Sequence, residues 1–166
     1  MLIILSGLPG TGKSAVADAI ARALRLPVIS VDPIESAILR AGIAPSFETG
    51  LAAYLVAATL ADGIMAAGLD TVIDAVNSVE YARDLWRALA RKHDVEMRII
   101  VCNVSDGSVH AARLASRDRG LALGEPTAKD VEHRRSEWTP WSEPYVTLDG
   151  TGDLAASVAE ALRYLV

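Results

Sequence analysis

Short apolar runs and longer amphipathic blocks follow one another along the whole chain. The short runs are bounded by glycine, proline or acidic residues, as buried strands are, whereas the long blocks place apolar residues at helical spacing. The pattern predicts strands at about residues 2–6, 27–31, 69–74, 96–104 and 145–148. It predicts helices at about residues 13–24, 33–40, 47–67, 78–92, 105–117, 127–137 and 153–165. Strands that alternate with helices indicate an α/β fold in three layers, a five-stranded parallel sheet with helices on both faces.

The length of 166 residues suits one domain, and we expect it to span residues 1–166. Two segments exceed what a simple alternation of strands and helices requires. One is an insert at about residues 33–67, and the other is a loop at about residues 117–127 that contains Gly120, Gly124 and Pro126. Extra segments of this kind often carry substrate selection and closure of a site.

The composition limits the cellular location and the binding partners that we expect. The single cysteine, Cys102, excludes a disulfide framework, so we expect a reducing, cytoplasmic location. The first residues lack the pattern of a signal peptide, and Glu48 and Asp62 interrupt the apolar stretch at residues 41–67, so we expect no membrane span. The net charge of −5 disfavours nucleic acid as a partner, but it is compatible with a small anion in a dedicated site.

A glycine-rich segment separates the first strand from the first helix. Its sequence, Gly7-Leu8-Pro9-Gly10-Thr11-Gly12-Lys13-Ser14, fits the phosphate-binding pattern G-x-x-x-x-G-K-[ST]. Glycines let the backbone N–H groups point inward as an anion nest, and the start of the helix that follows also favours anions. Lys13 can reach the β- and γ-phosphates, and Ser14 offers a hydroxyl to Mg²⁺. We therefore predict that residues 7–14 and the next residue, Ala15, bind a nucleotide.

The sequence lacks the other motifs of two large classes of nucleotide-binding protein. A GTPase needs N-K-x-D after a late strand, but Asn103-Val104-Ser105-Asp106 lacks the lysine. It also needs D-x-x-G after the third strand, but Asp74-Ala75-Val76-Asn77 lacks the glycine. The transporter signature L-S-G-G-Q is absent, and 166 residues leave no room for the extra domain of an ATP-driven machine.

A kinase needs a carboxylate for the acceptor hydroxyl, an acid that supports Mg²⁺, and a mobile cationic lid. Asp32 and Asp74 end the second and third predicted strands, so both should face the phosphate loop at the carboxyl edge of the sheet. Each could instead cap the helix that follows it. Arg113, Arg117 and Arg119 lead into the loop at about residues 117–127, where guanidinium groups would suit phosphate oxygens, and Arg117 is the strongest candidate.

These elements together resemble the P-loop small-molecule kinases. They are GLPGTGKS, a strand ending in Asp32, the string VIDAVN, and HAARLASR before a glycine- and proline-containing loop. Within that group the chain is most similar to bacterial AAA-type ATP-binding proteins akin to chloramphenicol phosphotransferase. Gluconate, shikimate and adenylylsulfate kinases are more distant relatives.

The resemblance implies a P-loop fold with ATP and Mg²⁺ as cofactors. It assigns Asp32 to the acceptor hydroxyl, as base or orienter, and Asp74 to Mg²⁺ beside Ser14. It also implies that Arg113 and Arg117 contact ATP and that the loop Asp149–Gly152 lies near the adenine. Acceptor-specific arginines cannot be placed by the resemblance, and Arg40 and Arg83 are the candidates that the sequence offers. Asn77 could face the acceptor or belong to a turn that starts a helix.

The sequence therefore predicts a phosphotransferase that moves the γ-phosphoryl group of Mg-ATP to a hydroxyl of a small molecule. Lys13, Asp32 and Arg117 would serve the transfer itself. Two alternatives remain at this stage: a nucleotide-binding regulatory protein without an acceptor, and a polynucleotide 5′-hydroxyl kinase, which the acidic net charge disfavours. The sequence does not identify the acceptor, and it leaves open whether the chain acts as a monomer or a homodimer.

Overall fold

The structure, a computed structural model, describes residues 1–166 except for the side chains of Ala128 and Glu137. Over these residues it has one five-stranded sheet, and all the strand pairs are parallel. The strands are β1 (Leu2–Ser6), β2 (Val28–Ser30), β3 (Thr71–Asp74), β4 (Met97–Asn103) and β5 (Tyr145–Asp149), in the order β2-β3-β1-β4-β5. The predicted parallel α/β sheet is confirmed.

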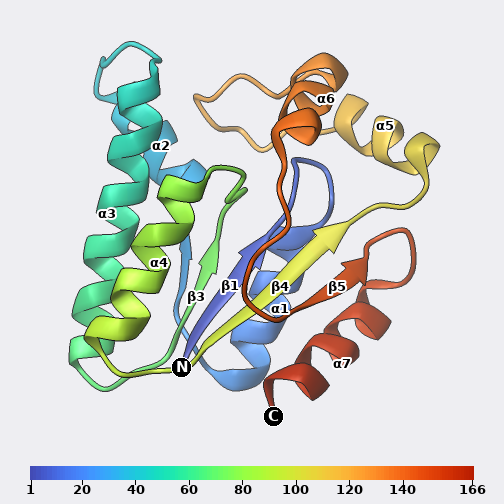
Figure 1. Ribbon diagram of the computed structural model, residues 1–166. Helices are drawn as coiled ribbons and strands as arrows, with labels where there is room; N and C mark the ends of the chain where they lie inside the picture. Colours follow the sequence, from blue (N-terminus) through green and yellow to red (C-terminus); the bar gives the residue numbers. More distant parts are fainter.

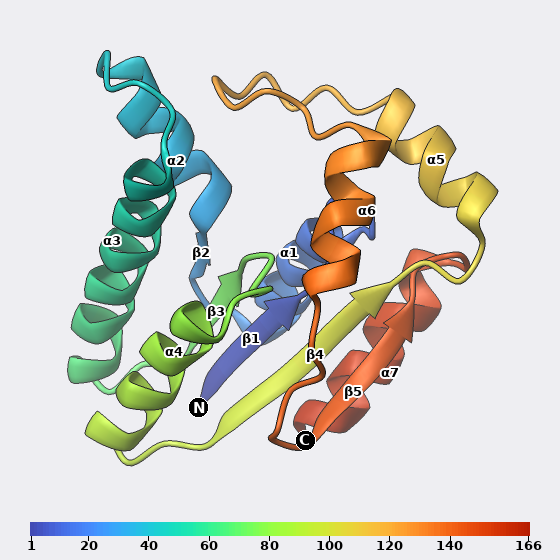
Figure 2. The same cartoon turned by 45° about the horizontal axis from the view of Figure 1, so that its top comes forward.

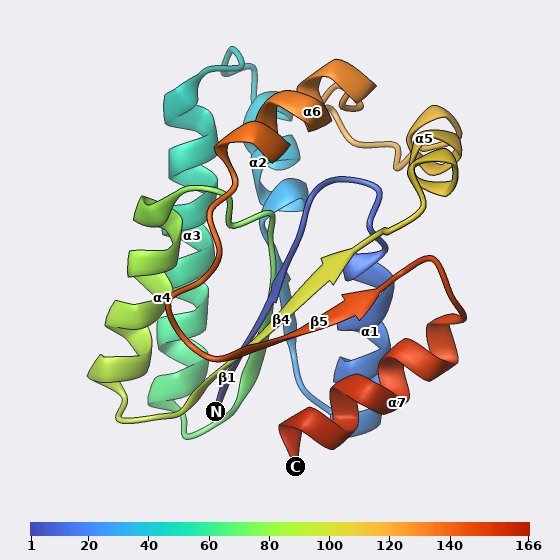
Figure 3. The same ribbon diagram turned by 45° about the vertical axis from the view of Figure 1, so that its right-hand side comes forward.

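Helices cover both faces of the sheet (Figures 1 and 3). The helices are α1 (Lys13–Leu24), α2 (Val31–Arg40), α3 (Phe47–Ala66), α4 (Glu80–Lys92), α5 (Gly107–Ala115), α6 (Ala128–Glu137) and α7 (Leu154–Leu165). α3 and α4 pack on one face, and α1 and α7 pack on the other. α2 packs against α3. α5 and α6 lie beyond the edge of the sheet at which the strands end (Figure 2).

The central strand β1 explains why the sheet is buried on both sides. Its side chains alternate between the two faces, so Leu2 and Ile4 pack in the core under α3 and α4, whereas Ile3 and Leu5 pack under α1 and α7. All of these side chains are fully buried. A run of apolar residues without alternation is therefore the pattern that this strand requires.

α3 is built around a row of small residues. Ala53, Ala57 and Ala61 recur every four positions and are fully buried, so one stripe of the helix approaches its neighbours closely. Ser46 and Thr49 form a reciprocal capping box that begins the helix. By length and composition alone α3 could cross a membrane, a test that the core helix of a soluble protein also passes.

Two predicted boundaries were wrong. β2 ends at Ser30 and α2 begins at Val31, so Asp32 lies in the first turn of a helix and not at the end of a strand. Pro33 is the third residue of this helix, where the missing N–H would have no intrahelical partner, so the helix can start before it. The helix predicted from about residue 78 begins later, at Glu80, and its N-cap is Val79, which makes no side-chain hydrogen bond.

Candidate functional site

The loop between β1 and α1 has the geometry of a phosphate loop. The Gly12 backbone is left-handed, with φ of 87°, as it turns into α1, and a glycine adopts this conformation at little cost. A Cβ atom on Gly7 would lie 2.3 Å from the carbonyl oxygen of Cys102, so no side chain fits there. The Thr11 hydroxyl donates to the Leu8 carbonyl at 2.8 Å and closes the loop on itself.

A cavity of about 410 Å³ opens beside this loop. It is lined by residues of the loop and of α1 from Gly10 to Val16, by the arginines at 113, 117 and 119, and by Gly150, Gly152, Leu154 and Ser157. The predicted phosphate-binding and lid residues therefore come together around one space, which we call the nucleotide cavity. Pro9, Gly7 and Leu8 face other cavities.

Lys13 and Asp74 form a buried pair at the floor of the site. The Lys13 Nζ lies 3.9 Å from Asp74 Oδ1, and the Ser30 hydroxyl donates to Asp74 Oδ2 at 3.1 Å. Among the described side chains, Asp74 Oδ1 has no hydrogen-bond partner although it is buried. A buried carboxylate oxygen without such a partner is costly, and it is the hard ligand that Mg²⁺ prefers. Asp74, together with the Ser14 hydroxyl, thus fits the predicted magnesium site.

In the described part of the chain, histidine, cysteine and acidic side chains form no group of three that could hold a metal ion by themselves. Magnesium usually binds through one or two carboxylates and the phosphates of its nucleotide, and it keeps several waters. The small number of protein ligands is therefore compatible with a Mg-nucleotide complex.

Asp32 forms ion pairs with two arginines of the predicted lid. The Arg119 Nη1 lies 2.6 Å from Asp32 Oδ2, and the Arg117 Nη2 lies 3.9 Å from the same oxygen. Burial raises the pKa of Asp32, but the positive charges of Lys13, Arg119 and Arg117 outweigh it, so the pKa lies below its ordinary value. Asp32 is therefore a carboxylate at neutral pH, between the phosphate loop and the lid.

A second cavity, of about 460 Å³, is lined in part by Asp32. Besides Asp32 and Pro9 it is lined by Glu35, Arg117, Arg119, Leu123, Gly124, Glu125, Pro126, Asp130, His133 and Arg134. We call it the acceptor-side cavity. Burial and the negative charge of Asp32 raise the pKa of Glu35, and the charge of Arg134 opposes this shift. The sequence analysis missed both residues, although Glu35 stands three residues after Asp32, one helical turn along the same face.

The lid (residues 117–127) is held by contacts within itself and by contacts with α2. The Arg117 Nε lies 3.1 Å from Glu125 Oε2, and the Arg119 N–H donates to Glu125 Oε1 at 3.2 Å. The Ala122 N–H donates to the buried hydroxyl of Ser36 on α2 at 2.8 Å. The segment therefore bridges from α5 to α2 above the ends of the strands (Figure 2).

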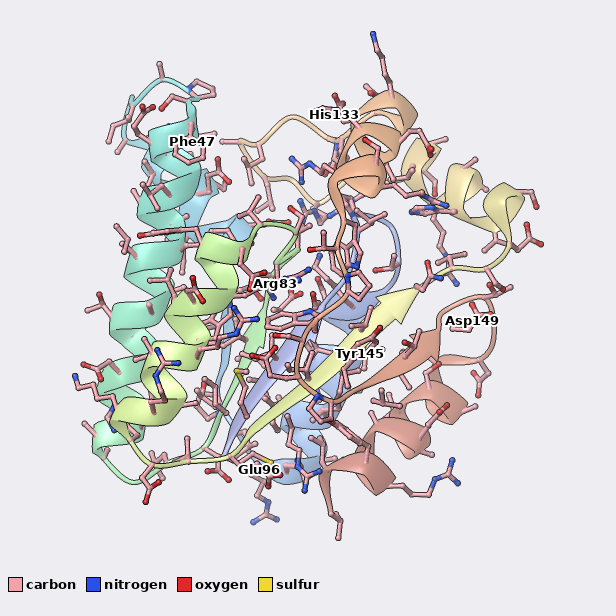
Figure 4. All side chains as sticks on the ribbon, in the orientation of Figure 1. Phe47, Arg83, Glu96, His133, Tyr145 and Asp149 are labelled. Atoms are coloured by element: carbon pink, nitrogen blue, oxygen red, sulfur yellow. The ribbon has the colours of Figure 1, made fainter. Side chains whose placement is uncertain are left out.

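Arg113 lies at the far end of the nucleotide cavity. Its Nη2 donates to the Gly150 carbonyl at 2.6 Å, in the loop that follows β5 at Asp149 (Figure 4). The three predicted arginines thus divide their contacts: Arg113 on α5 holds the loop after the last strand, while Arg117 and Arg119 in the lid reach toward Asp32.

Arg83 and Asn77, which the sequence suggests as acceptor-binding residues, make contacts inside the fold instead. Arg83 is buried in the interior (Figure 4), where it donates to the carbonyls of Asn77, Thr139 and Pro140 and lies against the rings of Trp138 and Trp141. Asn77 is fully buried with φ of 55°, and its side chain contacts the Leu5 carbonyl and the Trp86 indole. Neither residue lines the acceptor-side cavity, and neither does Arg40, so the suggestion that they bind the acceptor is not supported.

Comparison with known proteins agrees with this geometry. The model of the AAA domain family matches residues 2–136. No curated protein matches the sequence significantly. Among solved structures, a kinase candidate from Chloroflexus aurantiacus J-10-fl is 25% identical, with a TM-score of 0.78 over 99% of this chain and 98% of that one.

Two further solved structures share the fold at lower identity. A gluconokinase from Sinorhizobium meliloti 1021 is 22% identical, with a TM-score of 0.72 over 98% of this chain and 90% of that one. An APS kinase from Mycobacterium tuberculosis, in complex with AMPPNP and APS, is 18% identical, with a TM-score of 0.72 over 99% and 96%. The predicted resemblance to P-loop small-molecule kinases is therefore confirmed, and the chain belongs to the AAA domain family, with the fold of a P-loop kinase.

Proposed function

We propose that the protein transfers the γ-phosphoryl group of Mg-ATP to a hydroxyl group of a small polar molecule. The single observation that carries this proposal is the position of Asp32. This carboxylate lines the acceptor-side cavity, and it is paired with Arg117 and Arg119, which line both that cavity and the nucleotide cavity. A regulatory nucleotide-binding protein would need no second polar cavity at this point.

The nucleotide half of the reaction is assigned to the phosphate loop and the lid. The inward amides of the loop and Lys13 would hold the β- and γ-phosphates. Magnesium, held by the phosphates and by Ser14 and Asp74, would offset charge on the triphosphate. Arg117 and Arg119 would turn from Asp32 and Glu125 to the phosphate oxygens, which a guanidinium group can bind through two parallel hydrogen bonds.

The acceptor half of the reaction is assigned to Asp32. The hydroxyl oxygen of the acceptor attacks the γ-phosphorus, the bond from that phosphorus to the β,γ-bridging oxygen breaks, and ADP leaves with the electron pair. The hydroxyl proton passes to the carboxylate of Asp32. Because the transition state of phosphoryl transfer is loose, orientation contributes more than basicity, and the lowered pKa of Asp32 keeps it as the carboxylate that such orientation needs.

The acceptor-side cavity favours a polar acceptor with charged or hydrogen-bonding groups. Carboxylates of Glu35 and Asp130 and the guanidinium of Arg134 line it together with the lid. Its volume of about 460 Å³ suits a metabolite-sized molecule. Nucleic acid is a poor candidate, since the net charge of the chain is −5.

The test is a panel of hydroxyl-bearing metabolites and antibiotics with γ-labelled ATP, scored for labelled product. In the Asp32→Asn variant we expect turnover to fall by about 100-fold or more, with the affinity for Mg-AMPPNP weakened by no more than about threefold, because Asp32 contacts the acceptor and not the phosphates. In Lys13→Ala we expect transfer to be lost together with tight nucleotide binding. The control is Asp18→Asn, whose side chain is exposed on α1.

Full transfer by Asp32→Asn would remove the role assigned to that residue. Slow ATP hydrolysis that no member of the panel changes would favour a regulatory protein instead. Label transferred to an oligonucleotide with a 5′-hydroxyl group would favour a polynucleotide kinase.

A further inference from the structure

His110 lies directly behind the phosphate loop. It stands on α5, its side chain is buried, and its ring packs so tightly against the loop that a Cβ atom on Gly10 would come within 3.0 Å of the His110 Cδ2. The sequence gives this histidine no special role, because the three histidines, His93, His110 and His133, stand far apart and show no metal-ligand spacing. The structure places it in contact with two residues of the predicted nucleotide site.

Two hydrogen bonds determine the tautomer of the ring. His110 Nε2 lies 2.7 Å from the Pro9 carbonyl oxygen, which can only accept, so Nε2 carries the proton. His110 Nδ1 lies 3.2 Å from the Arg135 Nη2, and a guanidinium group can only donate, so Nδ1 presents its lone pair. The ring is therefore the neutral Nε2–H tautomer, held between the phosphate loop and α6.

The bond to Pro9 fixes the direction of an amide in the loop. In a trans peptide, the carbonyl of one residue and the N–H of the next point in opposite directions, and the described chain has no cis peptide bond. When His110 holds the Pro9 carbonyl on the outer side of the loop, the Gly10 N–H must point the other way. Gly10 lines the nucleotide cavity. Among the turn, loop and cap hydrogen bonds of the described backbone, none is donated by the Gly10 N–H.

The bond to Arg135 connects this loop to the acceptor side. Arg135 and its neighbour Arg134 lie near the end of α6, and Arg134 lines the acceptor-side cavity. A shift of this end of α6 when an acceptor binds would therefore move the partner of His110. Because it invokes an acceptor, this last link rests on the proposed function.

We propose that His110 is a positioning residue for the phosphate loop: its Nε2–H aims the Gly10 amide at the nucleotide phosphates, and Arg135 holds the ring in the tautomer that can do so. The residue acts through Pro9 and Gly10 and does not touch the phosphates. Its loss should therefore weaken nucleotide binding without removing a charge from the site.

A pair of substitutions tests the hydrogen bond against simple packing. His110→Leu removes the donor and keeps an apolar side chain, whereas His110→Gln keeps an N–H near the position of Nε2. By calorimetry with Mg-AMPPNP we expect His110→Leu to bind about five- to tenfold more weakly, the effect of one net hydrogen bond. His110→Gln should stay within about threefold of the unchanged protein. The control is His93→Gln, because His93 pairs with Asp62 away from the cavity.

Equal binding by His110→Leu and the unchanged protein would overturn the proposal, and so would equal loss in the Leu and Gln variants. If the variants do not fold, ¹⁵N-resolved NMR of the histidine ring in the unchanged protein decides: the Nε2–H tautomer supports the proposal, and the Nδ1–H tautomer contradicts it. Both readouts use nucleotide binding or the free protein. A failure to find any acceptor would therefore refute the proposed kinase activity without touching this inference.

Discussion

Asp32 is the side chain at which positive charges of the phosphate loop and of the lid converge. Lys13 belongs to the first, and Arg117 and Arg119 belong to the second. The net effect on Asp32 is a lowered pKa, despite burial that acts in the opposite direction. A group with a lower pKa in the folded state stabilises that state above its unfolded pKa, and the contribution is lost as the pH falls through the folded value.

We therefore predict that Asp32→Asn lowers the free energy of unfolding at pH 7. This difference from the unchanged protein should shrink as the pH falls below the ordinary pKa of 3.8 and through the lowered pKa of the folded state. Urea denaturation at pH 7 and at about pH 3 measures the difference. The control Asp18→Asn, at an exposed position, should differ little from the unchanged protein at either pH. A difference for Asp32→Asn that is constant with pH would show that its ion pairs contribute nothing.

Single residues of the site could be predicted where their chemistry is local. The anion nest of Gly7–Ser14 is formed by one continuous segment, so the motif can be recognised directly in the sequence. Asp32 and Arg119 were both named as candidates from the sequence, but their ion pair joins positions 87 residues apart. No local pattern specifies which of the three candidate arginines reaches which carboxylate.

Among the elements, the lid is the one whose attachment the sequence does not reveal. Its backbone is held to α2 by the hydrogen bond from the Ala122 N–H to the buried Ser36 hydroxyl. We predict that Ser36→Ala speeds cleavage by trypsin after Arg117 or Arg119 by about three- to tenfold, since a net hydrogen bond of about 1 kcal/mol holds the segment closed.

Limited proteolysis followed by mass spectrometry measures the rate and the site of this cleavage. Ser116→Ala is the matched control, because the Ser116 hydroxyl bonds only within its own helix end, to the carbonyls of Ala112 and Arg113. Unchanged cleavage in Ser36→Ala would mean that the arginine pairs alone hold the lid.

The helices and strands themselves follow closely from periodicity. α1 has the predicted ends, and α3 ends within one residue of the prediction. The exception with a consequence for the site is the junction of β2 and α2, where the helix was predicted to begin at Pro33. Because a proline is tolerated anywhere in the first turn, it marks the start of a helix only to within a few residues. Asp32 moved from a strand end to a helix start on that account, yet it still faces the carboxyl edge of the sheet.

At the scale of the whole molecule, the nucleotide cavity is assembled from segments that lie far apart in the sequence. The phosphate loop follows β1, α5 follows β4, and the loop Asp149–Gly152 follows β5. β1 and β4 are neighbours, as are β4 and β5, so parallel pairing brings all three loops to one edge. The sequence predicted each segment, but their close packing depends on strand order, which periodicity does not encode.

Gly150 is the point of closest approach between these segments. A Cβ atom there would lie 2.5 Å from the Thr11 carbonyl oxygen and 3.2 Å from that of Asn103. Because both contacts are with backbone atoms, neither can rotate away. We predict that Gly150→Ala displaces the last loop from the phosphate loop and weakens binding of Mg-AMPPNP by about tenfold or more, a loss of about 1.4 kcal/mol.

The matched control is Gly107→Ala, where an added Cβ meets nothing within 4 Å and the residue lies outside the nucleotide cavity. Calorimetry on both variants, with thermal unfolding alongside, separates lost affinity from lost folding. The backbone of the phosphate loop is itself fixed by the Thr11 hydroxyl and by His110, so it should not yield to the new methyl group. If Gly150→Ala binds Mg-AMPPNP as tightly as Gly107→Ala, the loop after β5 is free to move and is no part of the nucleotide site.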